Sequence, residues 1–300
     1  MKPTTTLNLT ETTDRRLKII MPIIESKNLN ILKSGGLCYI TFPSLSVDGV
    51  KHAFSTRLGG KSEGIFSSMN LSFSRGDDPQ NVLENYRIIC KAINVDYKKC
   101  VLSKQTHTTN IRIVTLDDIG KGIVKERDFD DVDGLITDIP GVTLVTQYAD
   151  CVGLLFYDPV KKVIAASHAG WRGTVGEIGR KTVETMQSHF GSDPKNILAA
   201  IAPSIGPCCF EVDSPVYDEF IKLKNIDLNR IIKGKPNGKY NIDLWECNRQ
   251  ILINAGVDPE NISVTDLCTK CHPDVFFSHR ATKGKRGNLA ALICLDEVSK

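Results

Sequence analysis

Residues 151–168 have the sequence CVGLLFYDPVKKVIAASH, and this stretch decides the fold. Two apolar runs, GLLF and VIAA, flank the turn signal DPVK. Apolar runs on either side of such a turn are typical of a β-hairpin. In a hairpin the end of the second strand returns beside the start of the first, so we expect His168 to lie near Cys151.

Other apolar runs rich in β-branched residues predict further strands along the chain. They lie at residues 37–40, 52–55, 111–114, 142–145, 197–201 and 289–293. Helical spacing and cap signals predict helices over residues 79–92, 174–190 and 243–253. Strands and helices interleave without a strict period, so we predict an α+β fold, an α/β mixed-sheet sandwich. Residues 1–36 are predicted to be a loosely ordered N-terminal extension.

The composition argues against several classes of protein. With 38 basic and 35 acidic residues, the net charge of +3 is too balanced for a nucleic-acid binder. No apolar run approaches the ~20 residues that span a bilayer, and the first residues lack the pattern of a secretory signal. We therefore expect a cytoplasmic protein with no nucleic-acid or membrane partner, whose ten cysteines are thiols or metal ligands.

Three residues at the edges of strand-like runs have side chains suited to metal binding, namely His107, Cys151 and His168. Two imidazoles and one thiolate make a zinc site with an open fourth position, which distinguishes catalytic from structural zinc. Two other interpretations stay open. Cys151 can be a small buried residue beside ordinary histidines, or Cys151 and His168 can be a nucleophile and its base, with Asp150 as a nearby acid. Such a dyad has no need of His107, which therefore separates the two active-site hypotheses.

Two Gly-rich turns each carry an arginine that is suited to binding an anion. Arg57 lies in residues 56–64 after a strand, where backbone N–H groups can approach a phosphate. Arg172 lies in residues 168–173, which lead from a strand into a helix N-terminus that favours anions. We assign Arg57 and Arg172, together with Gln105, to substrate and phosphate binding, although a tight turn and packing explain the two segments as well.

Two further segments contain cysteines. Cys208 and Cys209 are adjacent, which disfavours an unstrained disulfide between them, and we expect them to form a pocket wall. Residues 268–272 match the C-x-x-C-H haem attachment string, but that chemistry needs export and the chain shows no signal peptide. A structural zinc ion at Cys268 and Cys271 would need a fourth ligand that the sequence does not identify.

Eight motifs occur in the order that is found in one protein family. They are FSTRxGG from Phe54, MNL from Met69, GD from Gly76, KQxH from Lys104, DVDGL from Asp131, ADC from Ala149, HAGWRG from His168 and IGPCC from Ile205. Together they resemble the bacterial laccase-domain family over residues 37–295. That family was long labelled multicopper polyphenol oxidase and is now regarded as a family of purine nucleoside phosphorylases.

The resemblance implies that His107, Cys151 and His168 bind zinc in the active site. It implies that adenosine, inosine, guanosine and S-methyl-5'-thioadenosine react with phosphate to give the free base and ribose 1-phosphate, and that adenosine is also deaminated. Asp150, beside a ligand, is the candidate acid for deamination. The expected partners are small-molecule nucleosides and phosphate, and the expected assembly is a monomer or small homo-oligomer. The implied fold is a single laccase-like domain over residues 37–300, similar to the catalytic domain of cytotoxic necrotizing factor, a Cys-His deamidase.

The chain departs from the family pattern at His279, where a Tyr is usual, so Arg280 and Arg286 receive no role. The laccase label also fails on counting, because a multicopper oxidase needs about ten His ligands in paired H-x-H motifs. This chain has six His and no H-x-H motif. Zinc is the expected cofactor, although Cu²⁺ binds such a site more tightly in vitro. Two alternatives stay open, a Cys151–His168 thiol hydrolase or deamidase and a non-enzymatic, zinc-stabilised binding module.

Overall fold

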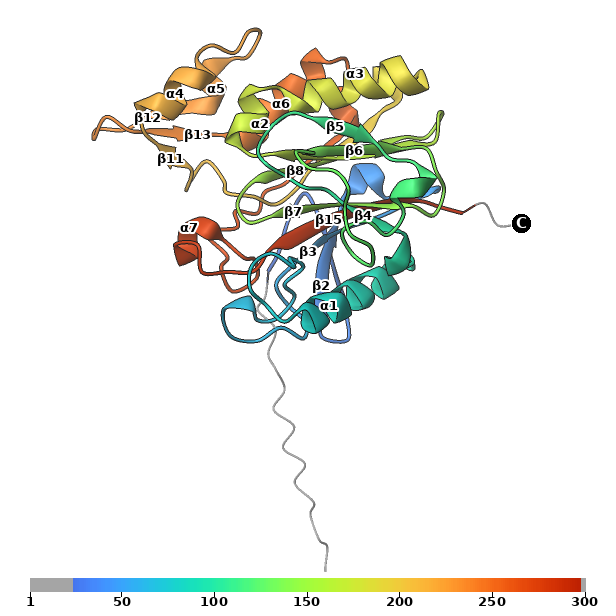
Figure 1. Cartoon of the computed structure of the whole chain (residues 1–300). Helices are drawn as coiled ribbons and strands as arrows, with labels where there is room; N and C mark the ends of the chain where they lie inside the picture. Colours follow the sequence, from blue (N-terminus) through green and yellow to red (C-terminus); the bar gives the residue numbers. More distant parts are fainter. Residues whose placement is uncertain (1–23, 298–300) are drawn as a thin grey trace, which may run out of the picture.

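The computed structural model describes residues 24–297, which form four layers (Figure 1). Two six-stranded sheets pack face to face through a shared apolar core. Helix α1 (Pro79–Ala92) covers the outer face of the first sheet, and helices α3 (Ile178–Phe190) and α6 (Leu244–Asn254) cover that of the second. The predicted mixed α/β class is therefore confirmed, whereas the likeness to cytotoxic necrotizing factor stays a prediction.

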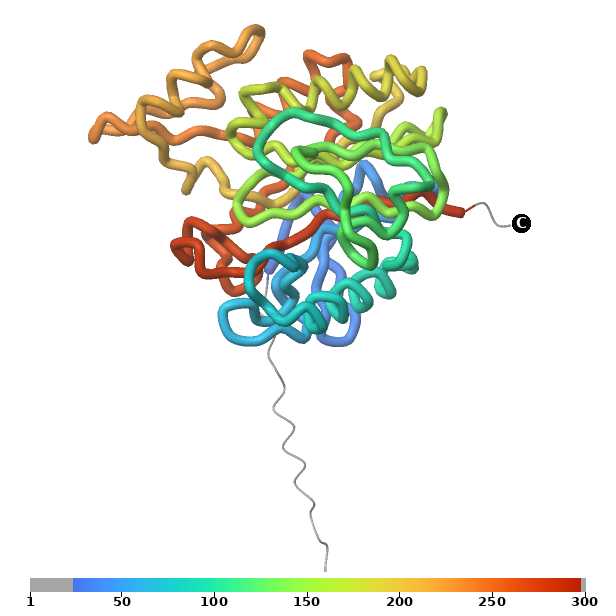
Figure 2. The backbone as a smooth tube through the Cα atoms, in the orientation of Figure 1, coloured from blue at the N-terminus to red at the C-terminus, as the bar shows by residue number. Residues whose placement is uncertain are grey.

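The first sheet joins the two ends of the described chain. Its strands, in spatial order, are β1 (Asn30–Ser34), β2 (Leu37–Thr41), β3 (Val50–Ser55), β15 (Leu289–Leu295), β7 (Thr143–Tyr148) and β4 (Cys100–Leu102). Among the described strands of this sheet, only the β4–β7 pair is parallel. Figure 2 shows how β15, drawn in red near the end of the chain, lies beside β3, drawn in blue near its start.

The second sheet contains the predicted hairpin at its centre. Its strands, in spatial order, are β14 (Ile262–Val264), β10 (Leu198–Ile201), β8 (Val152–Asp158), β9 (Val163–Ala169), β6 (Gly134–Thr137) and β5 (Ile111–Ile113). Strands β8 and β9 pair antiparallel with Gly153 opposite His168, which confirms the hairpin and the predicted closeness of His168 to Cys151. A small third sheet consists of β11 (Glu211–Val212), β13 (Tyr240–Ile242) and β12 (Ile232–Gly234).

Strands β8 and β9 are buried on both faces, which explains why they are continuously apolar. Successive side chains of a strand point to opposite faces. Leu155 and Ala166 accordingly pack in the core between the two sheets, while Leu154 and Ala165 pack in the core under α3 and α6. The hairpin that carries Cys151 and His168 is thus fixed from both sides.

The remaining helices are short, and one of them corrects a prediction. They are α2 (Trp171–Val175), α4 (Ser214–Phe220), α5 (Leu228–Ile231) and α7 (His279–Thr282). The single helix predicted over residues 174–190 is in fact divided between α2 and α3, because Glu177 adopts a left-handed backbone conformation that interrupts it. The predicted α1 is confirmed with its bounds, and Asp243 caps α6 through the N–H groups of Trp245 and Glu246, as expected.

The predicted boundary of the N-terminal extension is wrong within the described residues. Residues 30–34 form β1, an edge strand paired with β2, and Ile24 and Leu29 are buried. The side chains of β1 are mostly exposed, so it lacks the apolar pattern by which strands are recognised in a sequence. The prediction for residues 1–23 lies outside the described residues. Between residues 24 and 297, no helix is both long and apolar enough to cross a bilayer.

Candidate metal centre and its pocket

Three segments far apart in the sequence bring the predicted metal ligands together. His107 lies in the loop that follows β4, Cys151 directly precedes β8, and His168 lies on β9. One potential donor atom of each residue lies within 4.8 Å of those of the other two. The two imidazole rings meet edge to face with their centroids 4.9 Å apart. The fold therefore supplies the convergence that the sequence spacing could not.

Asp133, directly before β6, holds two of these ligands in place. Its carboxylate accepts a hydrogen bond from Nδ1 of His168 at 2.7 Å and from the backbone N–H groups of Thr106, His107 and Thr108 at 2.9, 3.1 and 3.0 Å. Burial alone would raise the pKa of Asp133, but these hydrogen bonds outweigh it and lower the pKa to about 2. An ionised carboxylate that fixes Nδ1 leaves Nε2 of His168 as the nitrogen available to a ligand.

The charges of the group are mutually stabilising. Burial disfavours a thiolate at Cys151, yet the positive charge of His168 and hydrogen bonds with both histidines lower the pKa of Cys151 to about 6. Burial also disfavours a charged His168, but the thiolate and Asp133 raise its pKa to about 9. A thiolate and an imidazolium therefore coexist at neutral pH, which is also the charge state of a Cys-His nucleophile pair.

Gly170 leaves room around the three donors. A Cβ atom at this position would lie 3.1 Å from Sγ of Cys151, 3.3 Å from Cδ2 of His107 and 3.4 Å from Cε1 of His168. A Cβ atom would therefore crowd Cys151 and His107 and touch His168. Two imidazoles and one thiolate around this space fit a zinc ion with three protein ligands and one open position.

A cavity of about 320 Å³ opens beside the three donors, which is enough for a small ligand. It is lined by His107, Cys151 and His168 and by four cationic side chains, Arg75, Lys104, Arg127 and Arg286. The cavity therefore places positive charge next to the candidate metal centre.

Arg286 has an unused donor at this wall. Its Nη1 donates to the carbonyl of Gly287 and to the side chain of Asn288, but its buried Nε has no hydrogen-bond partner among the described residues. Burial and the charge of Arg75 lower the pKa of Arg286 to about 10. A half-buried guanidinium with a like charge nearby is suited to an anion, which would offset the repulsion.

Residues 51–296 match the family model described as multi-copper polyphenol oxidoreductase laccase. The chain belongs to this family. It is 37% identical over 246 residues to the purine nucleoside phosphorylase YlmD of Bacillus subtilis, covering 82% of this chain and 88% of that protein. It is also 37% identical over 240 residues to the adenosine deaminase RL5 of an unknown prokaryotic organism, covering 78% and 90%.

Solved structures of proteins similar in sequence have the same fold. The hypothetical protein YfiH of Bacillus licheniformis superposes with a TM-score of 0.84 at 34% sequence identity, covering 90% of this chain and 100% of that chain. The resemblance inferred from the eight motifs is therefore confirmed. The relatives named as a phosphorylase and a deaminase indicate that this laccase-family chain is an enzyme.

Of the other predicted site residues, Gln105 lines the cavity, whereas Arg57 and Arg172 do not. Gln105 lines the cavity, where its amide is held by Ser103 and by the backbone of Gln147. Arg57 does not line it, because its guanidinium donates to two backbone carbonyls and lies 4.8 Å from the ring of Phe277. Arg172 is exposed and stacks on its neighbour Trp171 at 4.2 Å.

Asp150 also lies outside the cavity lining. Its two carboxylate oxygens accept hydrogen bonds from Oγ1 of Thr269 and from the backbone N–H of Arg280, each at 2.7 Å. Its φ of 84° places it in the left-handed region at the turn before Cys151. Asp150 thus fixes the shape of the turn that presents Cys151.

Sequence reasoning did not identify Asp133 or Arg75 as site residues, and it left the role of Arg286 open. Asp133 lies within the DVDGL motif and Arg75 directly precedes the GD motif. The motifs therefore marked both segments, but they did not indicate what either residue does. Arg286 lies in the loop before β15. The sequence offered no basis for assigning it a role, because the chain departs from the family pattern nearby, at His279. His279 Nδ1 in fact lies 3.4 Å from a terminal nitrogen of Arg286.

Proposed function

We propose that the chain is a zinc-dependent purine nucleoside phosphorylase that also deaminates adenosine. The carrying observation is that Arg286, with a buried and unpartnered Nε, lines the same cavity as the three metal donors. Phosphorolysis has two reactants, phosphate and a nucleoside. The cationic side chain is suited to bind the phosphate, and a metal held by the three donors would act as a Lewis acid on the nucleoside. The names of the relatives support both activities.

The proposed substrates are adenosine, inosine, guanosine and S-methyl-5'-thioadenosine. In phosphorolysis an oxygen of phosphate bonds to C1' of the sugar while the glycosidic C–N bond breaks and its electron pair stays on the purine. The products are the free base and ribose 1-phosphate, or the methylthio sugar phosphate from the last substrate. The reaction needs a cationic site for phosphate and a way to stabilise charge on the departing base.

We assign the phosphate site to Arg286 and Arg75 in place of Arg57 and Arg172. Arg75 is held by a bond to the carbonyl of Gly284 at 2.8 Å, in the same loop that carries Arg286. A dianionic phosphate between the two guanidinium groups would offset their repulsion and accept hydrogen bonds from them. Gln105, fixed beside them, is assigned to the nucleoside.

The metal ligands are His107, Cys151 and His168. When bound, zinc supplies a Lewis acid that stabilises negative charge on a departing purine and activates water for deamination. Asp133 keeps a proton on Nδ1 of His168, so that the proton of Nε2 is the one displaced when zinc binds. We reassign Asp150 from proton shuttle to positioning residue, because both of its oxygens are already used by Thr269 and Arg280.

One observation favours a second candidate function. The Cys151, His168 and Asp133 side chains also have the arrangement of a thiol hydrolase, in which a carboxylate orients a histidine beside a thiolate. In that case His107 would be dispensable and no metal would be needed. A thiol hydrolase or deamidase is therefore the alternative that the experiments must exclude.

The test is incubation of zinc-quantified protein with adenosine, with and without phosphate, followed by chromatography of the products. The proposal predicts adenine and ribose 1-phosphate only when phosphate is present, and inosine in both cases. Absence of turnover with all four nucleosides, in protein with zinc bound, would reject the proposal and favour the thiol hydrolase.

A further inference from the structure

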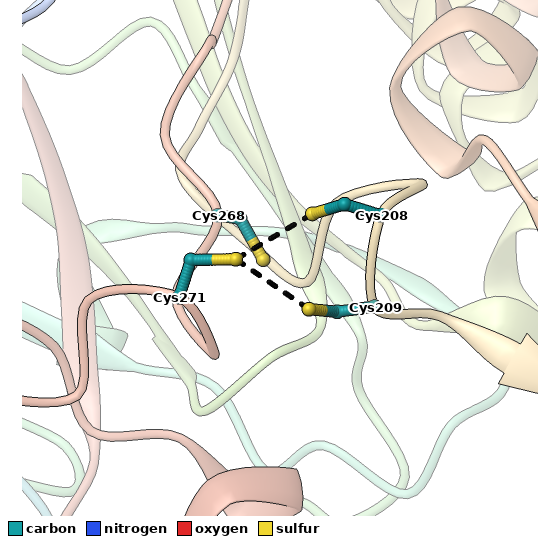
Figure 3. Close-up of side chains that lie close together, drawn as sticks. All are labelled: Cys208, Cys209, Cys268 and Cys271. Atoms are coloured by element: carbon teal, nitrogen blue, oxygen red, sulfur yellow. Dashed lines mark hydrogen bonds between the residues drawn. The ribbon is translucent and has the colours of Figure 1, made fainter.

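Four cysteines outside the pocket also lie close together, and the proposed nucleoside chemistry does not use them. Cys208 and Cys209 lie in the loop between β10 and β11, and Cys268 and Cys271 lie in the turn region after β14. Figure 3 shows the four side chains directed toward one another from the two loops. Every sulfur lies within 4.8 Å of the other three.

The sulfur spacing suits a shared metal ion. Sγ of Cys271 lies 3.6 Å from that of Cys208 and 3.5 Å from that of Cys209. Zinc bound to four thiolates at ~2.3 Å in a tetrahedron sets sulfurs about 3.8 Å apart. A disulfide needs about 2.05 Å, and the adjacent Cys208 and Cys209 are poorly placed to pair with each other.

Hydrogen bonds from backbone N–H groups also hold the two cysteine-bearing loops together. The backbone N–H of Thr269 donates to the carbonyl of Ser204 at 2.9 Å, and that of Gly206 donates to Sγ of Cys268 at 3.2 Å. A Cβ on Gly206 would lie 2.8 Å from the Trp245 ring and 3.2 Å from Cβ of Cys268, so only glycine allows this approach. The N–H donor to sulfur also stabilises a thiolate, the form that binds metal.

We propose that Cys208, Cys209, Cys268 and Cys271 bind one structural zinc ion, separate from the metal of the pocket. Four thiolates fill the tetrahedral positions of zinc and leave none for water or substrate, which is the ligand set of a structural site. The IGPCC loop supplies the ligands that the C-x-x-C segment lacks by itself. The same geometry argues against haem attachment at Cys268 and Cys271, since their sulfurs face two more thiols.

This zinc would also stabilise the turn that presents Cys151. Thr269 directly follows a proposed ligand and donates its hydroxyl to Asp150. The backbone N–H of Ile205, in the other loop, donates to the carbonyl of Asp150 at 2.9 Å. Both loops that hold the proposed zinc therefore contact the residue next to Cys151, so the structural site supports the pocket without taking part in its chemistry.

The first test is the zinc content of full-length protein purified under reducing conditions with zinc present. We expect about two zinc ions per chain in the unaltered protein and about one in the Cys271→Ser variant. Cys90→Ala is the matched control and should keep both ions, since Cys90 packs in the core under α1 and its sulfur lies 3.7 Å from that of Cys100, in neither metal group. A Cys271→Ser protein that retains the full zinc content contradicts the proposal.

The second test does not depend on folding of a cysteine variant. X-ray absorption at the zinc edge of the His107→Ala protein should report four sulfur neighbours at ~2.3 Å and no nitrogen, because only the proposed structural zinc remains. Nitrogen or oxygen neighbours, or no zinc at all, would overturn the proposal, as would a mass that shows any of the four cysteines in a disulfide. These readouts do not involve nucleoside turnover, so they stand or fall independently of the proposed enzyme activity.

Discussion

The molecule has two groups of side chains that can share a metal, and they differ in the number of donors and in their surroundings. His107, Cys151 and His168 offer three donors beside a cavity of about 320 Å³ with a cationic wall. The four-cysteine group offers four donors on two loops. Three donors beside a cavity leave room for a substrate, whereas four donors complete the coordination of the metal. A metal bound at either group would therefore act according to what holds its fourth position, a substrate or water in the pocket and a fourth thiolate in the cysteine group.

The origins of the two groups also differ. The three donors of the pocket depend on the central hairpin, which is buried on both faces and packed between two layers. The four cysteines lie on loops at the edge of the second sheet, where part of the cluster is exposed. We therefore expect the pocket to control turnover and the four-cysteine group to control local stability.

The largest expected difference is in catalysis. Cys151→Ser should lower the rate of adenosine phosphorolysis about 1,000-fold, since a lost Lewis acid is worth several kcal/mol of transition-state stabilisation. Cys271→Ser should change the rate less than about tenfold at a temperature where it is folded, because its effect reaches the pocket only through the Asp150 turn. The measurement is the steady-state rate of adenosine phosphorolysis by both variants. Equal losses would remove the functional distinction between the two groups.

The next effect separates the two reactions of the pocket. Arg286→Ala should lower phosphorolysis about 10- to 100-fold, because a charge-assisted hydrogen bond contributes ~1.5–3 kcal/mol. Deamination, which uses no phosphate, should change much less. Arg249→Ala is the control, since Arg249 is a partly exposed arginine of α6 that pairs with Glu246 and does not line the cavity. An equal loss in Arg172→Ala protein would return the phosphate site to one of the two arginines, Arg57 and Arg172, that the sequence predicted.

Asp133→Asn should weaken zinc binding at the pocket about 10- to 100-fold, because the amide no longer fixes His168 as a carboxylate does. The four-cysteine group shares no hydrogen bond with Asp133 among the described contacts and should keep its zinc. Competition with a coloured zinc chelator measures both affinities in one titration. Two affinities that fall together would show that the groups are not independent.

The smallest effect concerns stability. Loss of the structural zinc in Cys271→Ser should lower Tm by about 10 °C, because zinc binding stabilises only the folded form and each kcal/mol shifts Tm by a few degrees in a chain of this size. Cys90→Ala is the control for the loss of a cysteine elsewhere. Calorimetry with and without added zinc should show a larger rise in Tm in the control than in Cys271→Ser, which keeps only the pocket zinc.

Much of the fold could be predicted because its central strands are buried on both faces. A two-sided core requires continuous apolar runs, so β8, β9 and β15 stand out in the sequence. The exposed edge strand β1 carries no such pattern, and the break between α2 and α3 depends on a single left-handed residue, Glu177. Neither feature has a periodic signal.

The candidate site likewise has a part that the sequence predicts and a part that it does not. The hairpin register brings Cys151 beside His168, so part of the metal centre follows from a local prediction. Arg286 and the pairing of the IGPCC loop with the C-x-x-C segment depend on loops that meet only in three dimensions. Arg57 and Arg172 looked suitable because Gly-rich turns often bind anions, but tertiary contacts use the Arg57 side chain elsewhere and leave Arg172 exposed.

The most direct test of the central claim is adenosine phosphorolysis by the His107→Ala protein, with zinc content measured on the same sample. His107 is the residue that a metal centre needs and a Cys151–His168 dyad does not. The account predicts a loss of about 1,000-fold in kcat/KM, with one zinc ion per chain retained by the four cysteines. Full activity in His107→Ala protein that lacks the pocket zinc would contradict it.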